Sequence, residues 1–360
     1  MRGRAVRLVF GGFIALACAT AFVAAGPTAT RPPPRTLVVA KGPIRAFAQD
    51  ASTIAWVDSG YRVHVRRVAA KRGVVIGSAL QPGGYKVKSV RLVLAGKQAL
   101  WTSYDRGNFL YTHVYTGSPS LGEREVAELV YMPDDGPEGT YVGGLGGDGT
   151  TLVLGTIGQR CDNEYDCRRI DVDGNVKRVR SDAQDIPGVP PPVMLAVSAG
   201  RVALVPAKTP RFFPDIGAPR AAEFAPVQVY DLSGHLISSV VPPGTPRAIA
   251  LSWPKLAVLF EFVDGTRQIQ LYDARSGGYW AEDGAGVFRK VPLTVTHVAV
   301  GSAGVVWAVG REIYLLRRQK VELIRRASGN PIGLSIEGRR VAWAVNLKGG
   351  GRIVGLTLPA

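Results

Sequence analysis

The sequence contains few of the residues from which most catalytic and metal sites are built. It has 3 cysteines, 4 histidines and 3 methionines in 360 residues. No G-x-S-x-G nucleophile elbow, H-E-x-x-H pair or P-loop occurs in it. A convincing helical period is also lacking after residue 26, which argues against a helical or α/β fold. These absences exclude the commonest hydrolase, metalloprotease and nucleotide-binding signatures and leave an all-β fold.

The N-terminal segment predicts export. A basic start, MRGRAVR, is followed by an apolar run from Leu8 to Ala25 and then by Gly26, which is the pattern of a signal peptide cleaved after Ala25. The run is also just long enough to span a bilayer, so an uncleaved membrane anchor is the alternative. Lipidation of Cys18 is disfavoured, because Ala15 stands where such sites usually carry leucine.

We therefore assign residues 1–25 to a signal peptide or N-terminal membrane anchor and residues 26–35 to a proline-rich spacer, which contains TRPPPR. Either form places the protein outside the cytoplasm. The expected location is extracellular, periplasmic or associated with the cell envelope, and membrane contact is expected only through an uncleaved N-terminal segment.

A pattern of strand, short turn and apolar triplet recurs seven times along the rest of the chain. Successive triplets end 45, 53, 50, 54, 49 and 36 residues apart. The triplets are IAW ending at Trp56, ALW at Trp101, LVL at Leu154, VAL at Leu204, LAV at Val258, VVW at Trp307 and VAW at Trp343.

Several repeats also contain a second turn, as in DVDGN at Asp171, YDLSG at Tyr230 and YDARSGG at Tyr272. Such a repeat predicts a four-stranded antiparallel meander, and its period is that of a β-propeller blade. We predict an all-β fold, a single seven-bladed β-propeller over residues 36–358. The last repeat has room for only three strands, so we expect TLVVA, residues 36–40, to pair into it and close the ring.

At this point the chain resembles the TolB-like and WD-repeat propellers, because the strand, the small or acidic turn and the I-A-W-like triplet recur over residues 36–358. The Trp-Asp dipeptide typical of WD repeats is missing, so no specific family is indicated. For the TolB-like type the resemblance implies an exported binding or scaffolding role. It implies no role for any single residue.

Four tryptophans share one position in their repeats, namely Trp56, Trp101, Trp307 and Trp343. Exposed together they would form an aromatic ligand platform. Strand alternation instead places them on a buried strand between blades, so we predict that they pack in the core.

The longest connections fall on one face of the predicted propeller, where second strands lead to third strands and each blade leads to the next. Functional residues on a repeat scaffold usually lie in such loops. The loops are residues 131–139, 161–167, 181–192 and 206–226. The residues of the candidate binding face are Asp134, Asp135, Asp162, Glu164, Asp166, Arg211, Phe212 and Phe213.

The motif CDNEYDC contains Cys161 and Cys167, the two cysteines that remain after removal of the signal peptide. Two thiolates need two further ligands to bind zinc, and no histidine is nearby in sequence. The spacing is also wrong for a catalytic C-x-x-C pair. In an oxidising compartment an even number of cysteines favours a disulfide, which would stabilise this short loop by roughly 2 kcal/mol.

The chain is basic, with 44 Lys and Arg against 28 Asp and Glu and a net charge of +16. Basic clusters at 62–72, 168–180 and 311–326 could suggest nucleic acid, but an exported protein meets little of it. We interpret most of these residues as protected strand edges and expect no nucleic-acid partner. Attraction to anionic wall polymers or lipid head groups is a further interpretation.

The sequence thus favours a monomeric, exported, non-enzymatic propeller that binds a protein or an anionic cell-envelope polymer through its loop-rich face. No catalytic residue, metal site or cofactor is predicted. The four histidines, His64, His113, His235 and His297, fall in separate blades. His297 is on an innermost strand and could face the channel, but as a lone histidine it is interpreted as structural.

Two alternatives remain open. One is a lyase or glycan hydrolase that uses Asp134, Asp162 or Asp166 as acid and base. The other is a propeller that binds Ca²⁺ through the acidic residues of 162–173.

Overall fold

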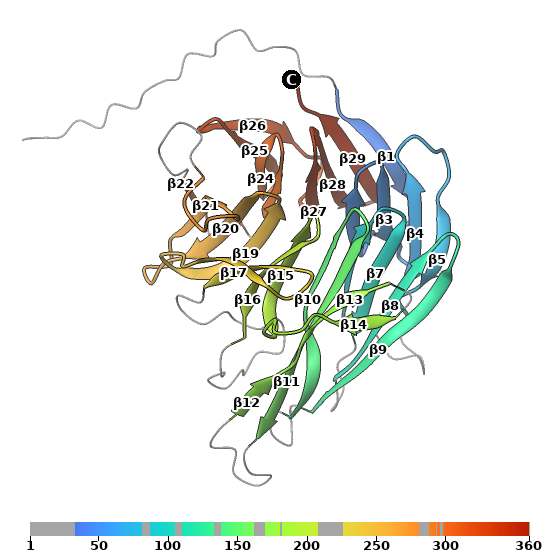
Figure 1. Ribbon diagram of the computed structural model, residues 1–360. Coiled ribbons are helices and arrows are strands. Elements are labelled where there is room, and N and C mark those ends of the chain that lie inside the picture. The colour runs from blue at the N-terminus through green and yellow to red at the C-terminus, as the bar shows by residue number, and fades with distance from the viewer. Residues whose placement is uncertain are drawn as a thin grey trace, which may run out of the picture. The chain divides into compact units, whose positions relative to one another are not determined.

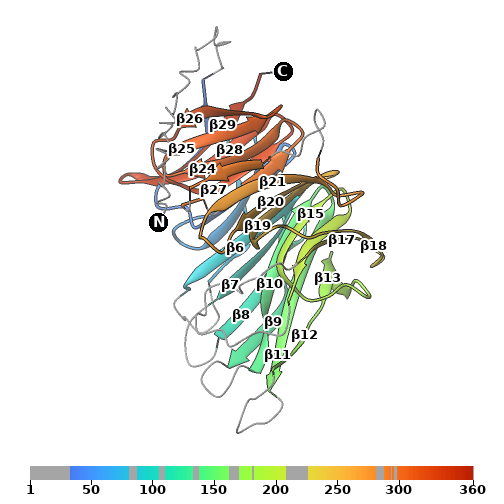
Figure 2. The same ribbon diagram turned by 90° about the vertical axis from the view of Figure 1, so that its left-hand side faces the viewer.

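The computed structural model describes residues 33–80, 87–104, 110–132, 138–161, 170–180, 182–207, 226–280, 288–292, 294–295 and 298–359. Regular structure in these residues consists of antiparallel strands, with no helix among them (Figures 1 and 2). A helix that could cross a membrane is accordingly not found in the described part of the chain. The predicted signal or anchor segment, residues 1–25, lies outside it.

Five sheets contain four antiparallel strands each. The first is β2 (Ala46–Asp50), β3 (Thr53–Val57), β4 (Arg62–Arg67) and β5 (Val74–Ser78). The second is β15 (Pro192–Ser198), β16 (Arg201–Pro206), β17 (Val227–Asp231) and β18 (Leu236–Val240), and the third is β19 (Thr245–Ser252), β20 (Lys255–Glu261), β21 (Arg267–Asp273) and β22 (Phe288–Val291). The fourth is β23 (Val298–Gly301), β24 (Gly304–Val309), β25 (Glu312–Arg317) and β26 (Lys320–Arg326).

The fifth four-stranded sheet joins both ends of the described chain. It contains β1 (Arg35–Ala40), β27 (Pro331–Glu337), β28 (Arg340–Leu347) and β29 (Gly350–Thr357), in the order β1-β29-β28-β27. In its β1–β29 pair, Val38 lies opposite Ile353. The N-terminal strand therefore forms the outer strand of a sheet whose other three strands are the last three of the chain.

The remaining sheet has nine strands because two meanders are fused. Their strands are β6 (Ser89–Ala95), β7 (Gln98–Tyr104), β8 (Leu110–Ser118), β9 (Gly122–Met132), β10 (Glu138–Asp148), β11 (Thr151–Cys161), β12 (Ile170–Asp173), β13 (Val176–Val179) and β14 (Ala183–Asp185). The fusion lies where Met132 and Tyr131 of β9 pair with Glu138 and Gly139 of β10. This pairing was not predicted, and it arises because both strands run past the usual blade length.

The prediction of an all-β propeller built from antiparallel four-stranded sheets is confirmed. The innermost strands β2, β6, β10, β15, β19, β23 and β27 each contact the next, and β27 contacts β2. We call the edge where first strands turn into second strands the turn end of the sheets. The opposite edge, where second strands lead to third strands and each meander leads to the next, is the loop end.

The second strand of each meander is apolar without alternation because it is buried on both faces. In β20, for example, Leu256, Val258 and Phe260 belong to one apolar cluster, whereas Ala257 and Leu259 belong to another. All five side chains are fully buried. The apolar triplets of the repeats are thus the residues that join each sheet to both of its neighbours.

The four repeated tryptophans pack in the core as predicted, with exposed fractions of 7% or less. Trp101 stacks on Tyr115 at 5.9 Å and Trp307 stacks on Tyr314 at 5.7 Å, in each case across the second and third strands. Trp56 stacks on His64 at 4.7 Å. In these three sheets, a ring on the second strand therefore stacks on a ring on the third strand.

A β-bulge recurs at one position in five of the meanders. It lies in the fourth strand, where one extra residue is inserted opposite the third strand. The inserted residues are Leu37 in β1, Ile76 in β5, Val126 in β9, Ile237 in β18 and Ile324 in β26.

Candidate functional site

The strands that reach the loop end are longest in the fused sheet. Strands β8, β9, β10 and β11 contain 9, 11, 11 and 11 residues, whereas β2 to β5 contain 5 or 6 each. Figure 1 shows β9, β11 and β12 running beyond the ends of the other strands. The described ends of β9 and β11 therefore lie beyond the ends of the shorter strands.

The β11–β12 hairpin is anchored by a break in the third strand of its meander. Both β12 and β13 pair with β11, and Gly174 lies between them with φ of +119°. A Cβ on Gly174 would stand 2.3 Å from the carbonyl oxygen of Thr156, so only glycine fits. Next to it, the Thr156 hydroxyl donates to Asn175 Oδ1 at 2.8 Å. The hairpin therefore leaves the sheet at a fixed point.

The predicted disulfide and binding-face residues follow strands β9, β11 and β16 in the sequence. Of these residues the structure describes Cys161, which is the last residue of β11 and lies opposite Ile170 of β12. The others lie outside the described residues. They are Asp134, Asp135, Asp162, Glu164, Asp166, Cys167, Arg211, Phe212 and Phe213.

Three carboxylates converge at the turn end, which sequence reasoning did not single out. Asp50, Asp148 and Glu337 are the last residues of the first strands β2, β10 and β27, and they bring one oxygen each within 4.8 Å of the others. Such oxygen ligands suit Ca²⁺ or Mg²⁺. Their shared repeat position was the available signal, because the end of every first strand points toward the same edge of the sheets.

Burial and mutual repulsion act on these carboxylates. Burial raises the pKa of Asp50. The hydrogen bond from the Gly96 N–H stabilises the anion and lowers the pKa, whereas the charge of Asp148 raises it. Burial also raises the pKa of Glu337, with added repulsion from Asp50 and then Asp148.

Two of the carboxylates also link neighbouring sheets. Asp50 accepts a hydrogen bond from the backbone N–H of Gly96, and Asp148 accepts one from Ala199 at 2.6 Å. Ser198, at the same repeat position, accepts one from the N–H of Trp253 at 3.1 Å. In these three sheets the last residue of the first strand therefore joins that strand to the turn of the next meander.

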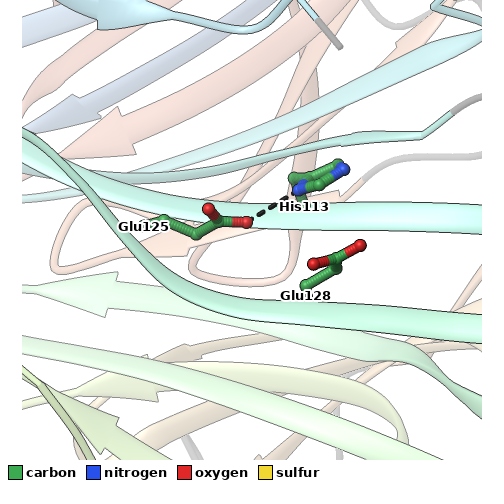
Figure 3. Close-up of side chains that lie close together, drawn as sticks. All are labelled: His113, Glu125 and Glu128. Atoms are coloured by element: carbon green, nitrogen blue, oxygen red, sulfur yellow. Dashed lines mark hydrogen bonds and ion pairs between the residues drawn. The ribbon is translucent and has the colours of Figure 1, made fainter. Parts of the chain in front are cut away.

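A third group lies on β8 and β9 and combines a histidine with two carboxylates. His113 Nδ1 is 2.7 Å from Glu125 Oε1, and one ligand atom each of His113, Glu125 and Glu128 lie within 4.8 Å of one another. Figure 3 shows the three side chains on the same side of the two strands. The His113 side chain is 8% exposed, and both glutamates are exposed.

The bulge at Val126 explains why both glutamates share a face with His113. Residues three apart on a regular strand point to opposite faces. Here Glu128 pairs with His113 and Glu125 pairs with Tyr115, because Val126 is inserted between the two pairs. Val126 and Ala127 both pack against the apolar cluster on the other side of the sheet.

The surroundings of this group are negatively charged. Burial raises the pKa of Tyr115 to about 12, and the charges of Glu125, Glu123 and Glu128 add to the shift. Sequence reasoning missed the group because it considered His113 only as one of four histidines in separate blades. Strand alternation alone does not reveal the bulge.

Replacement of Glu337 by glutamine is expected to stabilise the fold at pH 7 by about 0.5–1 kcal/mol, because it removes a charge repelled by Asp50 and Asp148. The folded-state pKa of Glu337 is raised, so the wild type loses stability as the pH rises from the ordinary value of 4.5 through the raised one. The increase in the free energy of unfolding caused by Glu337→Gln is therefore expected to shrink as the pH falls toward 4.5. Urea unfolding curves of both proteins across this pH range measure it.

Asp264→Asn serves as a control, because its effect on stability at pH 7 is expected to be opposite to that of Glu337→Gln. The Thr266 backbone N–H and hydroxyl lower the pKa of Asp264, so its stabilising charge is lost as the pH falls, and the variant is expected to lose stability at pH 7. A Glu337→Gln protein that is less stable at pH 7, together with melting of the wild type that depends on calcium, would show instead that the carboxylates hold a cation.

The Cys161–Cys167 disulfide stays a prediction. In the exported, non-reduced protein, mass spectrometry is expected to find the peptide containing both residues lighter by two hydrogens, and replacement of both by serine is expected to cost about 2 kcal/mol. Two free thiols in that peptide would contradict the prediction.

No protein-family model matches the chain, and no curated protein matches it. Similar solved structures include the WD40 repeats of RRP9, with 13% identity, 91% of this chain and 97% of that chain covered, and a TM-score of 0.47. Sqt1 of Saccharomyces cerevisiae has 9% identity, 89% and 97% coverage and a TM-score of 0.44. BamB from Moraxella catarrhalis has 11% identity, 87% and 85% coverage and a TM-score of 0.42. The WD40 repeats of RRP9, Sqt1 and BamB are thus among the solved structures that this chain is similar to, and no specific family is assigned.

Proposed function

We propose that this chain is an exported, non-enzymatic β-propeller that binds a protein or an anionic cell-envelope polymer through its loop end. The observation that carries the proposal is the extension of β8 to β11 beyond the length of the other strands. Extended, mutually paired strands are a rigid support for binding loops, and rigidity lowers the entropy lost on binding.

The propeller is proposed to be a closed ring of seven blades. The mutual contacts of seven innermost strands support this number, with the fused sheet supplying two blades. Closure is supported by the β1–β29 pair and by the contact of β27 with β2. In a closed ring each sheet is covered on both faces by its neighbours, which favours a monomer.

The two ends of the sheets differ in a way that favours the loop end for binding. At the turn end, side chains at the ends of first strands are already bonded to the turns of the next meander, as with Asp148 and Ala199. The loop end carries the connections that contain Asp134, Asp166 and Arg211. Charged and aromatic side chains together on one surface suit recognition of a protein.

Export and the basic charge narrow the class of partner. The N-terminal 25 residues have the pattern of a signal peptide or anchor, and the chain carries a net charge of +16. A positive surface attracts anionic polymers of the envelope over distances of about 10 Å at physiological salt. The proposed ligand is therefore a protein or an anionic polymer met outside the cytoplasm.

The test compares the full exported protein with a variant in which residues 208–225 are replaced by a short Gly-Ser linker. Both are used to capture partners from an envelope extract and to cosediment with an insoluble anionic wall polymer over a range of salt concentrations. The variant is expected to lose at least about tenfold in partner or polymer binding, because a hot-spot region contributes several kcal/mol.

Leu121→Asp is the matched control, because Leu121 is 65% exposed in the turn between β8 and β9, away from the loop end. This variant is expected to bind as the wild type does. Equal binding by the linker variant and the wild type would contradict the loop-end assignment. Turnover of a glycan that is lost on Asp166→Asn would favour an enzyme instead.

A further inference from the structure

We propose that His113, Glu125 and Glu128 form a zinc-binding site on the outer strands β8 and β9. The three residues bring one ligand atom each within 4.8 Å of one another, and two of those atoms come from one strand because of the bulge at Val126. The site is independent of the loop end and of any partner bound there.

The other bulged meanders act as an internal comparison, since their backbones have the same register around the bulge. They do not have the same side chains at the three positions. Arg62, Gln228, Glu312 and Arg352 stand where this sheet has His113. Val75, Leu236, Leu323 and Thr36 stand in place of Glu125, and Ser78, Ser239, Arg326 and Val39 stand in place of Glu128.

This comparison distinguishes the residues that recur with the bulge from the proposed metal ligands. The bulge recurs in five meanders with an aliphatic inserted residue each time, and it forms without a carboxylate at the positions of Glu125 and Glu128 in the other four. The position of Glu125 tolerates exposed apolar side chains, such as Leu236 at 52% and Leu323 at 47% exposure. Among the five bulged meanders, only this one combines an imidazole with two carboxylates. Packing therefore gives no reason for the combination.

The donor atoms point to zinc rather than to calcium. One imidazole nitrogen and two carboxylate oxygens suit Zn²⁺, whereas Ca²⁺ takes oxygen ligands alone. Zinc bonds of about 2.0–2.1 Å in a tetrahedron place ligand atoms about 3.3 Å apart. The two exposed glutamates need only small rotations to reach that spacing from within 4.8 Å. Water would occupy the fourth position.

An ion pair between His113 and Glu125 is the simpler role for the same contacts. In that role the 2.7 Å contact needs a proton on His113 Nδ1, and Glu128 contributes only a nearby charge. Binding of Zn²⁺ at Nδ1 would displace this proton to solvent and bring Glu128 into contact with the ion. The two roles therefore differ in whether Glu128 matters and in whether metal is bound.

The experiment measures Zn²⁺ binding to tag-free full-length protein by competition with a chromogenic chelator. The wild type is expected to bind one equivalent and to melt at a higher temperature when zinc is present. Glu125→Leu and Glu128→Ser, which introduce residues found at these positions in other meanders, are each expected to weaken binding by at least about 100-fold. Both are expected to fold, because the same residues occur beside the same bulge elsewhere in the chain.

His235→Gln is the control for binding to surface histidines, because exposed His235 pairs with Asp231 at 3.3 Å outside this group. It is expected to leave zinc binding unchanged. Co²⁺ added in place of zinc is expected to give a visible spectrum that His113→Gln abolishes. Wild-type protein that binds no zinc, or unchanged binding by Glu125→Leu and Glu128→Ser, would overturn the proposal. Binding of Ca²⁺ without Zn²⁺ would overturn the assignment of the ion.

Discussion

The pairing of β1 with β29 is the constraint on which the other sheets depend. It joins residues 35–40 to residues 351–355, so nearly the whole described chain lies between the two partners. Ile44 N–H donates to Asn346 Oδ1 at 2.7 Å, and Asn346 Nδ2 donates to the Ile44 carbonyl at 3.0 Å. Val38 and Ile353 share one apolar cluster with Trp56 of β3. Without this pair, β29 would present an open edge and the cluster beneath it would meet water.

The repeat pattern predicted the strands well because it reports burial. A second strand buried on both faces must be continuously apolar, and a turn before it must be small or acidic, so IAW and VAW mark their strands without any knowledge of the neighbours. The same reasoning placed Trp101 and Trp343 in the core, where both are almost fully buried. Local rules suffice where each repeat obeys the same packing.

The features that were not predicted depend on register rather than on pattern. The β9–β10 pairing arises from strand length, and the convergence of Asp50, Asp148 and Glu337 depends on how the first strands meet. The group around His113 depends on one inserted residue, Val126, which changes the face of every residue beyond it. All eight residues of the predicted binding face lie outside the described ranges, and that face stays a prediction.

Repetition also makes differences between the sheets informative. A bulge or a stacked aromatic pair that recurs in several meanders belongs to the scaffold, as Trp101 on Tyr115 and Trp307 on Tyr314 show. Features that the other meanders do not share need another explanation. The long strands β9 to β11 and the group of His113, Glu125 and Glu128 are both of this kind, and both lie in the fused sheet.

Hydrogen exchange of the backbone amides of β1 tests the ring most directly, because exchange reports pairing in solution. If β1 closes the propeller, amides in Arg35–Ala40 that bond to β29 exchange as slowly as those of β28 in the same sheet. Exchange of residues 35–40 at the rate of an unstructured peptide, with β28 still protected, would contradict the account.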